Sequence, residues 1–381
     1  MADPRPVHPL VGLLGHATGL YDDLTVAENV RFWTRAGARG PAMPAAMARL
    51  GLDGRLASVP VARLSAGQRR RAALAVMVAR RPRLWLLDEP HASSTKPAET
   101  WSTGSWSMPS PPGRRCCSHR TSSIEPRRWR TAACTSPAEP PPQSREAPGR
   151  CPLADRARLD PAAARLVAGK DLRLEWRSRV AVSQLLPFAL LVLVLFAFAL
   201  DPDRSVLRDA APGLFWLAVL FSTLLAIQRA FAVETVDGIV DALRISGLDP
   251  AGIFLGKAAG IALHLLVVEV ALGVGVTVMY GASPSGPLLV VASAVAATVG
   301  LAAAGAIYGV LAAGLRVRDT LLPILWLPVV APLLIGATQA FDAAYEQTSG
   351  AGWRWCGLLA AFALLYAAIG IFAFEPLLEE S

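Results

Sequence analysis

Six long apolar stretches in the C-terminal part constrain the fold of this chain more than any other feature. Each is close to the length of about 20 residues that a helix needs to cross the hydrocarbon core of a membrane. They lie at residues 180–200, 212–233, 253–279, 286–313, 320–338 and 354–374. Glycine and proline inside them are tolerated because neighbouring membrane helices can satisfy the freed backbone groups. The sequence therefore predicts a mostly α-helical protein with six transmembrane helices.

Charged residues beside these stretches predict their orientation. Lys170, Arg173 and Arg177 precede the first stretch, and Arg316 and Arg318 separate the fourth from the fifth. Of the loops on the opposite side, the first balances arginine against aspartate, the second carries no charge, and the third carries Asp342 and Glu346. Because cytoplasmic loops carry an excess of Lys and Arg, we expect a multi-pass protein with both termini in the cytoplasm.

The second cytoplasmic connection, residues 234–250, alternates acidic and apolar residues at helical spacing. The apolar residues on one face of this short helix would be Val236, Ile239, Val240 and Leu243. Such a helix at the inner surface of the membrane is a candidate docking element for an ATPase. A helix that serves only as an interfacial anchor fits the same pattern. The candidate coupling residues are Arg229, Glu234, Asp237 and Gly238.

A different pattern occupies residues 64–90 near the N-terminus. A Leu-Ser-Ala-Gly-Gln turn at 64–68 precedes a helical segment, and an apolar strand at 84–87 ends in Asp88 and Glu89. Backbone N–H groups and the positive dipole end at a helix N-terminus bind phosphate. A carboxylate at a strand end holds Mg²⁺ through water, and the next one can polarise an attacking water. The sequence contains no G-x-x-x-x-G-K-[ST] phosphate loop.

These two motifs resemble the signature motif and the Walker B motif of ATP-binding-cassette (ABC) ATPases. The resemblance implies that Ser65, Gly67 and Gln68 contact the γ-phosphate of ATP held by a second subunit. It implies that Asp88 lies on the Mg²⁺ side and that Glu89 is the catalytic base. Since phosphoryl transfer depends on the phosphate loop, the alternative is that these residues are a silent remnant. We expect residues 1–93 to be an incomplete α/β ABC-ATPase fragment that does not hydrolyse ATP alone.

The membrane part resembles the CcmB permease of the heme exporter in cytochrome c maturation, over about residues 162–376. The resemblance rests on the segments 211–216, 224–231, 237–238, 255–257 and 321–335. The N-terminal part is similar to the partner ATPase family, CcmA, through Gly15-His16, through the segment 24–29 and through the two motifs above. Both parts thus resemble subunits of one transporter.

The resemblance implies a protein of the bacterial inner membrane. The implied partners are an intact ABC ATPase subunit, a second permease copy, other cytochrome c maturation membrane proteins and a heme chaperone. The implied cofactors are ATP and Mg²⁺, with heme as the candidate substrate. Two alternatives remain open: a non-transporting scaffold for heme-handling partners, and a permease for another hydrophobic substrate.

Residues 94–160 are predicted to be a linker that precedes the permease of residues 161–381. After residue 93 the ATPase family has Leu-Asp and later Ser-His, where this chain has Ser94-Thr95-Lys96 and no matching switch. Reading codons for residues 94–106 and 116–128 one nucleotide earlier can restore both motifs. We hypothesise that about residues 94–150 derive from ATPase-coding DNA read out of frame. A natural disordered linker is the alternative, because Pro/Ser/Arg-rich composition is common in linkers.

Composition bears on the remaining function classes. The net charge of +8 is not accompanied by aromatic–basic interleaving, so we expect no nucleic-acid partner. The five cysteines fit neither zinc-site nor disulfide spacing, and we expect no metal site. His264 lies in the third apolar stretch, where a polar contact between helices is favoured over heme ligation. Glu269 would lie about 140° further round the same helix, so the two need not share a face.

Overall fold

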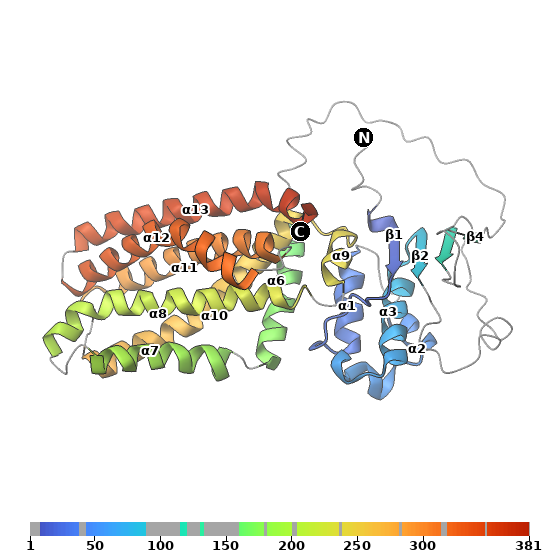
Figure 1. Cartoon of the computed structure of the whole chain (residues 1–381), viewed down its shortest axis with the longest axis horizontal. Helices are drawn as coiled ribbons and strands as arrows, with labels where there is room; N and C mark the ends of the chain where they lie inside the picture. The colour runs from blue at the N-terminus through green and yellow to red at the C-terminus, as the bar shows by residue number, and fades with distance from the viewer. Residues whose placement is uncertain are drawn as a thin grey trace, which may run out of the picture. The chain divides into compact units, whose positions relative to one another are not determined.

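A computed structural model describes most of the chain, and all statements below refer to the described residues. These are residues 8–37, 43–88, 115–119, 130–132, 160–178, 181–199, 204–235, 238–281, 284–313, 318–346 and 349–380. The chain divides into two units, one made of Met1–Leu159 with Glu234–Leu248 and one made of Asp160–Val233 with Asp249–Ser381. Figure 1 shows the elements of both units. The predicted domain limits at residues 93 and 160 stay predictions.

The first unit combines a small sheet with short helices. Its strands are β1 (Val11–Leu14), β2 (Leu84–Asp88), β3 (Arg115–His119) and β4 (Arg130–Ala132). Its helices are α1 (Val26–Ala36), α2 (Met43–Arg49), α3 (Ala66–Arg80) and α9 (Ile239–Arg244), with short turns η1 (His8–Leu10), η2 (Gly54–Ser58) and η3 (Val61–Arg63). The sheet order is β1-β2-β3-β4, with β3 and β4 antiparallel and the other neighbours parallel. The predicted apolar strand is therefore β2, a central strand.

Strands β3 and β4 lie within residues 94–160, the segment predicted as a linker. β3 pairs with β2 over its whole length, from Leu84 opposite Arg115 to Asp88 opposite His119. An unpaired edge of β2 would present a row of N–H and C=O groups without partners, and a parallel strand satisfies them. These two strands are the part of the segment that the structure describes, and the linker over residues 94–160 stays a prediction.

Local sequence signals explain where the helices of this unit begin. Thr25 caps α1 and forms a capping box with Glu28, and Ser65 forms the same box with Gln68 at the start of α3. Each box satisfies backbone donors that the first helical turn would otherwise leave unpaired. Phe32 and Trp33 of α1 form a buried aromatic cluster with Tyr21 of the preceding loop, with ring centroids 4.9–5.9 Å apart. This cluster fixes α1 beside the loop that precedes it.

The second unit is entirely helical in its described residues. Its elements are α6 (Pro161–Ser178), η4 (Ala181–Leu185), α7 (Leu186–Ala199), α8 (Arg204–Ala232), α10 (Pro250–Tyr280), α11 (Pro287–Ala313), α12 (Arg318–Tyr345) and α13 (Ser349–Glu380). The last five of these are long and apolar enough to cross a membrane. The first predicted stretch, residues 180–200, is formed by η4 and α7, which are bent by 57° from α6. A mostly α, multi-pass membrane fold is therefore confirmed, with a sixth span if the bent pair counts as one.

Helix α12 carries three prolines, at positions 323, 328 and 332. Proline removes a backbone donor and disturbs carbonyls in the preceding turn. Within this region the hydroxyl of Tyr366 in α13 donates a hydrogen bond to the Val329 carbonyl at 2.7 Å. A neighbouring helix thus supplies a donor to a proline-rich membrane helix, as the sequence argument requires.

Candidate functional site: the signature turn and the coupling helix

The signature turn at the start of α3 is built around its capping box. The Ser65 backbone N–H donates to Gln68 Oε1 at 3.0 Å, and the Gln68 N–H donates to Ser65 Oγ at 3.3 Å. Ser65 is exposed, whereas Gly67 and Gln68 are half-buried. The turn thus lies at the N-terminal end of a 15-residue helix, where the dipole favours phosphate, while the capping box itself uses the N–H groups of Ser65 and Gln68.

Arginines at the start of α3 connect this turn to the loop of residues 15–25. Arg70 donates a hydrogen bond to the Gly15 carbonyl, and Arg69 forms an ion pair with Asp22 at 3.1 Å. Gly15 belongs to the Gly-His pair from which the sequence inferred an ATPase resemblance. The structure therefore brings two resemblance motifs that lie 55 residues apart into direct contact.

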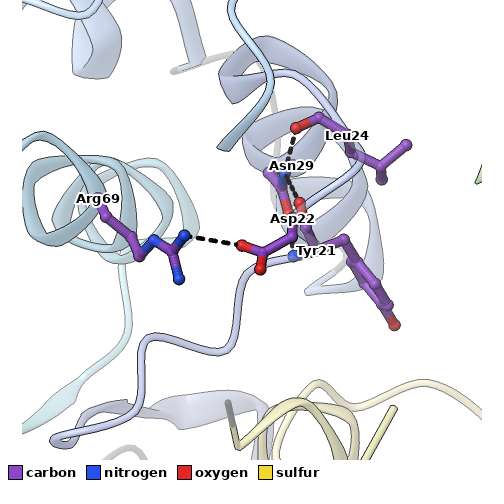
Figure 2. A network of polar contacts seen from close by, with 5 residues as sticks. All are labelled: Tyr21, Asp22, Leu24, Asn29 and Arg69. Carbon is purple, nitrogen blue, oxygen red and sulfur yellow. Dashed lines mark hydrogen bonds and ion pairs between the residues drawn. The ribbon is translucent and has the colours of Figure 1, made fainter. Parts of the chain in front are cut away.

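Asn29 holds the same loop from the other side, as Figure 2 shows. Its amide nitrogen donates to the carbonyls of Tyr21 at 2.9 Å and Leu24 at 3.3 Å, and its oxygen accepts from the Tyr21 N–H at 2.8 Å. The side chain is completely buried. In the sequence, Asn29 belongs to the segment 24–29 that is similar to the CcmA family, and no local pattern predicts its structural role. Its structural role is to fix the loop that carries Asp22.

Of the two acidic residues of the Walker B motif, Asp88 is among the residues that the structure describes and Glu89 is not. Asp88 is the last residue of β2 and lies opposite His119 of β3 in the sheet register. Glu89, the predicted catalytic base, lies outside the described residues, as does Asp237 of the coupling segment. Their predicted roles therefore stay predictions.

The amphipathic helix predicted within residues 234–250 is present as α9, over six residues. Gly238 precedes it in a left-handed conformation with φ +72°, which glycine adopts without strain. A Cβ atom at Gly238 would lie 3.0 Å from the Ala17 Cβ. Gly19, also left-handed, would place a Cβ 3.1 Å from the Ala242 Cβ. Loop 17–19 and α9 thus approach closely enough to require glycine at both positions.

Arg80, at the end of α3, binds the C-terminal end of α9. Its Nη2 donates to the carbonyls of Ile245 at 2.9 Å and Ser246 at 3.2 Å. Carbonyls at a helix C-terminus lack intrahelical partners and carry partial negative charge, so a guanidinium satisfies them. Burial lowers the pKa of Arg80 from its ordinary value, although a guanidinium stays protonated in proteins. Sequence reasoning missed Arg80, because its partners lie about 165 residues away.

Part of this contact is not fully packed. A cavity of about 40 Å³ is lined by residues of β1, α1, α3 and α9 and of the segments that follow β1 and α9, among them Thr18, Trp33, Arg80, Ala242 and Ile245. Thr18 Oγ1, Trp33 Nε1 and Arg80 Nε are buried without a hydrogen-bond partner in the described part of the chain. Such groups are costly unless water reaches them. The joint between α3 and α9 is therefore imperfect.

In the second unit, Arg229 near the end of α8 forms an ion pair with Glu175 of α6 at 3.5 Å. Glu175 also lies 3.7 Å from Nδ1 of His264 in α10. One turn earlier on α6, Asp171 lies 3.6 Å from the ammonium group of Lys257, which also donates to the Ala230 carbonyl at 2.8 Å. The carboxylates of Asp171 and Glu175 on α6 thus form ion pairs with residues of α8 and α10.

Glu234, the remaining coupling candidate, is buried and belongs to the first unit.

His264 and Glu269 face different neighbours. Glu269 accepts a hydrogen bond from the Thr298 hydroxyl of α11, whereas His264 faces α6. The two side chains therefore do not converge on one site. Among the residues that the structure describes, no group of three His, Cys, Asp or Glu side chains is arranged to hold a metal ion.

Comparison with known proteins gives a separate result for each part of the chain. Residues 162–381 match the family model described as CcmB protein, and residues 3–92 match the model described as ABC transporter. Heme exporter protein B of Paracoccus denitrificans is 34% identical over 175 residues, which are 45% of this chain and 78% of that protein. Heme exporter protein B of Pseudomonas aeruginosa is 29% identical over 215 residues, covering 55% of this chain and 94% of that protein.

The N-terminal part is similar to ATP-binding proteins. Cytochrome c biogenesis ATP-binding export protein CcmA 2 of Cupriavidus metallidurans is 48% identical over 86 residues, 22% of this chain and 40% of that protein. The CcmA protein of Vibrio cholerae is 45% identical over 92 residues, 23% of this chain and 44% of that protein. The chain therefore spans less than half the length of the ATP-binding relatives it matches.

Proposed function

Because the chain belongs to the CcmB protein family, we propose that it is the membrane subunit of an ABC-type heme exporter that acts in cytochrome c maturation. The observation that carries the proposal is the family match over residues 162–381, which coincides with the helices from α6 to α13. Five of these helices have the length and hydropathy of membrane spans. Heme is the proposed substrate, either transported or released to its chaperone.

The proposed partner is an intact ABC ATPase subunit that docks on α9. This helix joins α8 to α10, so a displacement of α9 acts directly on two membrane helices. The proposal is supported by the contacts of α9 with loop 17–19 and Arg80, which belong to the part of the chain that matches the ABC transporter family model. A second permease copy and the other maturation proteins complete the proposed assembly.

The roles proposed for the ATPase fragment follow from its two motifs. Ser65, Gly67 and Gln68 would contact the γ-phosphate of ATP held by a facing subunit, since they lie at the N-terminal end of α3 and the Ser65 side chain is exposed. Asp88 would hold Mg²⁺ through water, and Glu89 would polarise the attacking water. Bound Mg²⁺ would neutralise charge on the phosphates. We propose that the phosphate loop comes from the intact subunit.

The proposed location is the bacterial inner membrane with both termini in the cytoplasm. The support is the distribution of Lys and Arg between the loops, and Arg229 and Arg244 near α9 add to it. In this orientation α9 faces the compartment that contains ATP.

The test uses the intact ATPase partner rather than this chain. A strain that depends on this chain for holocytochrome c receives a partner whose Walker B glutamate is changed to glutamine. We expect holocytochrome c, measured by heme staining, to be lost while the chain stays in the membrane. Undiminished holocytochrome c would contradict ATP-driven export and favour a non-transporting scaffold.

A further inference from the structure

Helix α9 is already covered by another part of the same chain. The close approaches of Gly19 to Ala242 and of Gly238 to Ala17 leave no room for a further side chain between loop 17–19 and α9. Arg80 occupies the carbonyls at the other end of the helix. A subunit that docks on this face of α9 would have to take the place of these residues.

We propose that residues 8–88 occupy the coupling helix α9 in cis, and that an intact ATPase subunit reaches α9 only by displacing them. This inference rests on the proposed function, in which α9 is the docking element of the ATPase. The fragment then restrains the transporter, because a covered α9 is not connected to ATP hydrolysis on the intact subunit. The hydrogen bonds of Arg80 to the carbonyls of Ile245 and Ser246 stabilise the contact between the fragment and α9.

The imperfect packing of the joint makes such displacement feasible. The cavity beside Ala242 and Ile245 leaves part of the contact surface without partner atoms. Three buried polar atoms around it, on Thr18, Trp33 and Arg80, lack hydrogen-bond partners in the described residues. These atoms belong to the fragment and gain hydrogen bonds to water when it leaves α9, which lowers the free-energy cost of displacing it. The advantage of the fragment is its covalent attachment, which raises its effective concentration at α9.

The first experiment measures the cis contact itself in the full chain, purified into lipid nanodiscs. Hydrogen–deuterium exchange is followed at the backbone amides of residues 242–246 in the wild type, Arg80→Ala and Arg71→Ala. Arg71 is the matched control, because it lies on the same helix and donates to a backbone carbonyl, that of Leu50, away from α9. We expect Arg80→Ala to raise exchange at least about tenfold, because it removes the guanidinium that donates to the carbonyls of both Ile245 and Ser246. Unchanged exchange in Arg80→Ala would overturn the cis contact.

The second experiment measures competition, with the full-length CcmA relative from Vibrio cholerae as the probe. Arg80→Ala and Gly19→Val both loosen the fragment and leave α9 unaltered. We expect each variant to bind the probe about tenfold more tightly than the wild type, and Arg71→Ala to bind like the wild type.

The outcomes distinguish the occupation of α9 by the fragment from the role of α9 as the docking element of the ATPase. Equal affinity of the wild type and both loosened variants would overturn cis occupation and leave the docking role of α9 intact. Absence of binding to variants whose α9 amides exchange freely would overturn the docking role itself, and the inference with it.

Discussion

At the scale of single residues, Lys257 shows how a charge is accommodated in a long apolar helix. Its side chain is 1% exposed and contacts Asp171, the Ala230 carbonyl and the face of the Phe231 ring. A buried ammonium group is costly unless it is paired and hydrogen-bonded, and here each requirement is met by a different helix. Lys257 therefore links α6 and α8 to α10.

We predict that Lys257→Met destabilises the second unit by about 2–3 kcal/mol. Removing one partner of a buried pair costs about 3–5 kcal/mol, and Lys170 remains beside Asp171 to reduce this loss. Thermal unfolding in detergent measures the effect. Thr277→Val, on an exposed face of the same helix, is the control. A melting temperature equal to that of the control would contradict the linking role.

Asn29 gives the corresponding prediction for the first unit. Asn29→Leu keeps a similar volume but removes the acceptor of the Tyr21 N–H and two donated hydrogen bonds, although the carbonyls of Tyr21 and Leu24 still accept from the N–H groups of Leu24 and Val61. We expect a loss of about 2–3 kcal/mol, since stranded buried polar groups carry their full desolvation cost. Chemical denaturation followed by hydrogen–deuterium exchange at the backbone amides of α1 checks this. Asn29→Asp should lose at least as much, because a buried carboxylate oxygen then faces the carbonyls that accept from the amide nitrogen, and wild-type stability in either variant would refute the assignment.

At the scale of elements, the sequence predicted the helices and strands that depend on local residue patterns. It missed the side-chain contacts between residues far apart in the chain. The apolar runs of α8, α10, α11, α12 and α13 and the strand β2 were predictable because burial dictates their composition. Lys170 was counted as a cytoplasmic flanking charge, but the structure buries it beside Asp171. The contacts of Arg80 and Lys257 join residues 165 and 27 positions apart, which no local pattern encodes.

The contact between α6 and α10 depends on small residues. A Cβ at Gly252 or Gly256 would lie 2.6–2.8 Å from atoms of α6, and Gly260 follows one turn later on the same face. Small residues at such spacing allow membrane helices to approach closely. The two carboxylates of α6 can reach α8 and α10 only because of this approach.

We therefore predict that Gly256→Leu separates α6 from α10 and lowers the melting temperature in detergent by several degrees, as overpacking by about 1–3 kcal/mol does. Gly273→Leu is the matched control on the same helix, because a Cβ there meets nothing within 4 Å. If both substitutions had the same effect, helix propensity rather than the α6 contact would be responsible.

At the scale of the whole molecule, the proposed topology makes a separate prediction. A reporter fused between α10 and α11, after residue 281, should be periplasmic, and one fused between α11 and α12, after residue 313, should be cytoplasmic. Alkaline phosphatase activity distinguishes the two compartments. Activity in the second fusion and none in the first would reverse the orientation and remove α9 from the cytoplasm.

The central claim is that the chain exports heme as a CcmB-type subunit that is driven through α9. The direct measurement is the yield of holocytochrome c in a strain that lacks its own heme exporter protein B and expresses this chain. We compare the wild type with Ile239→Asp/Leu243→Asp, which places charge on the buried face of α9, and with the exposed control Asp241→Asn. The account predicts that the wild type and the control restore holocytochrome c and that the double variant, present in the membrane at an equal level, does not. Equal restoration by all three proteins, or none by the wild type, would contradict it.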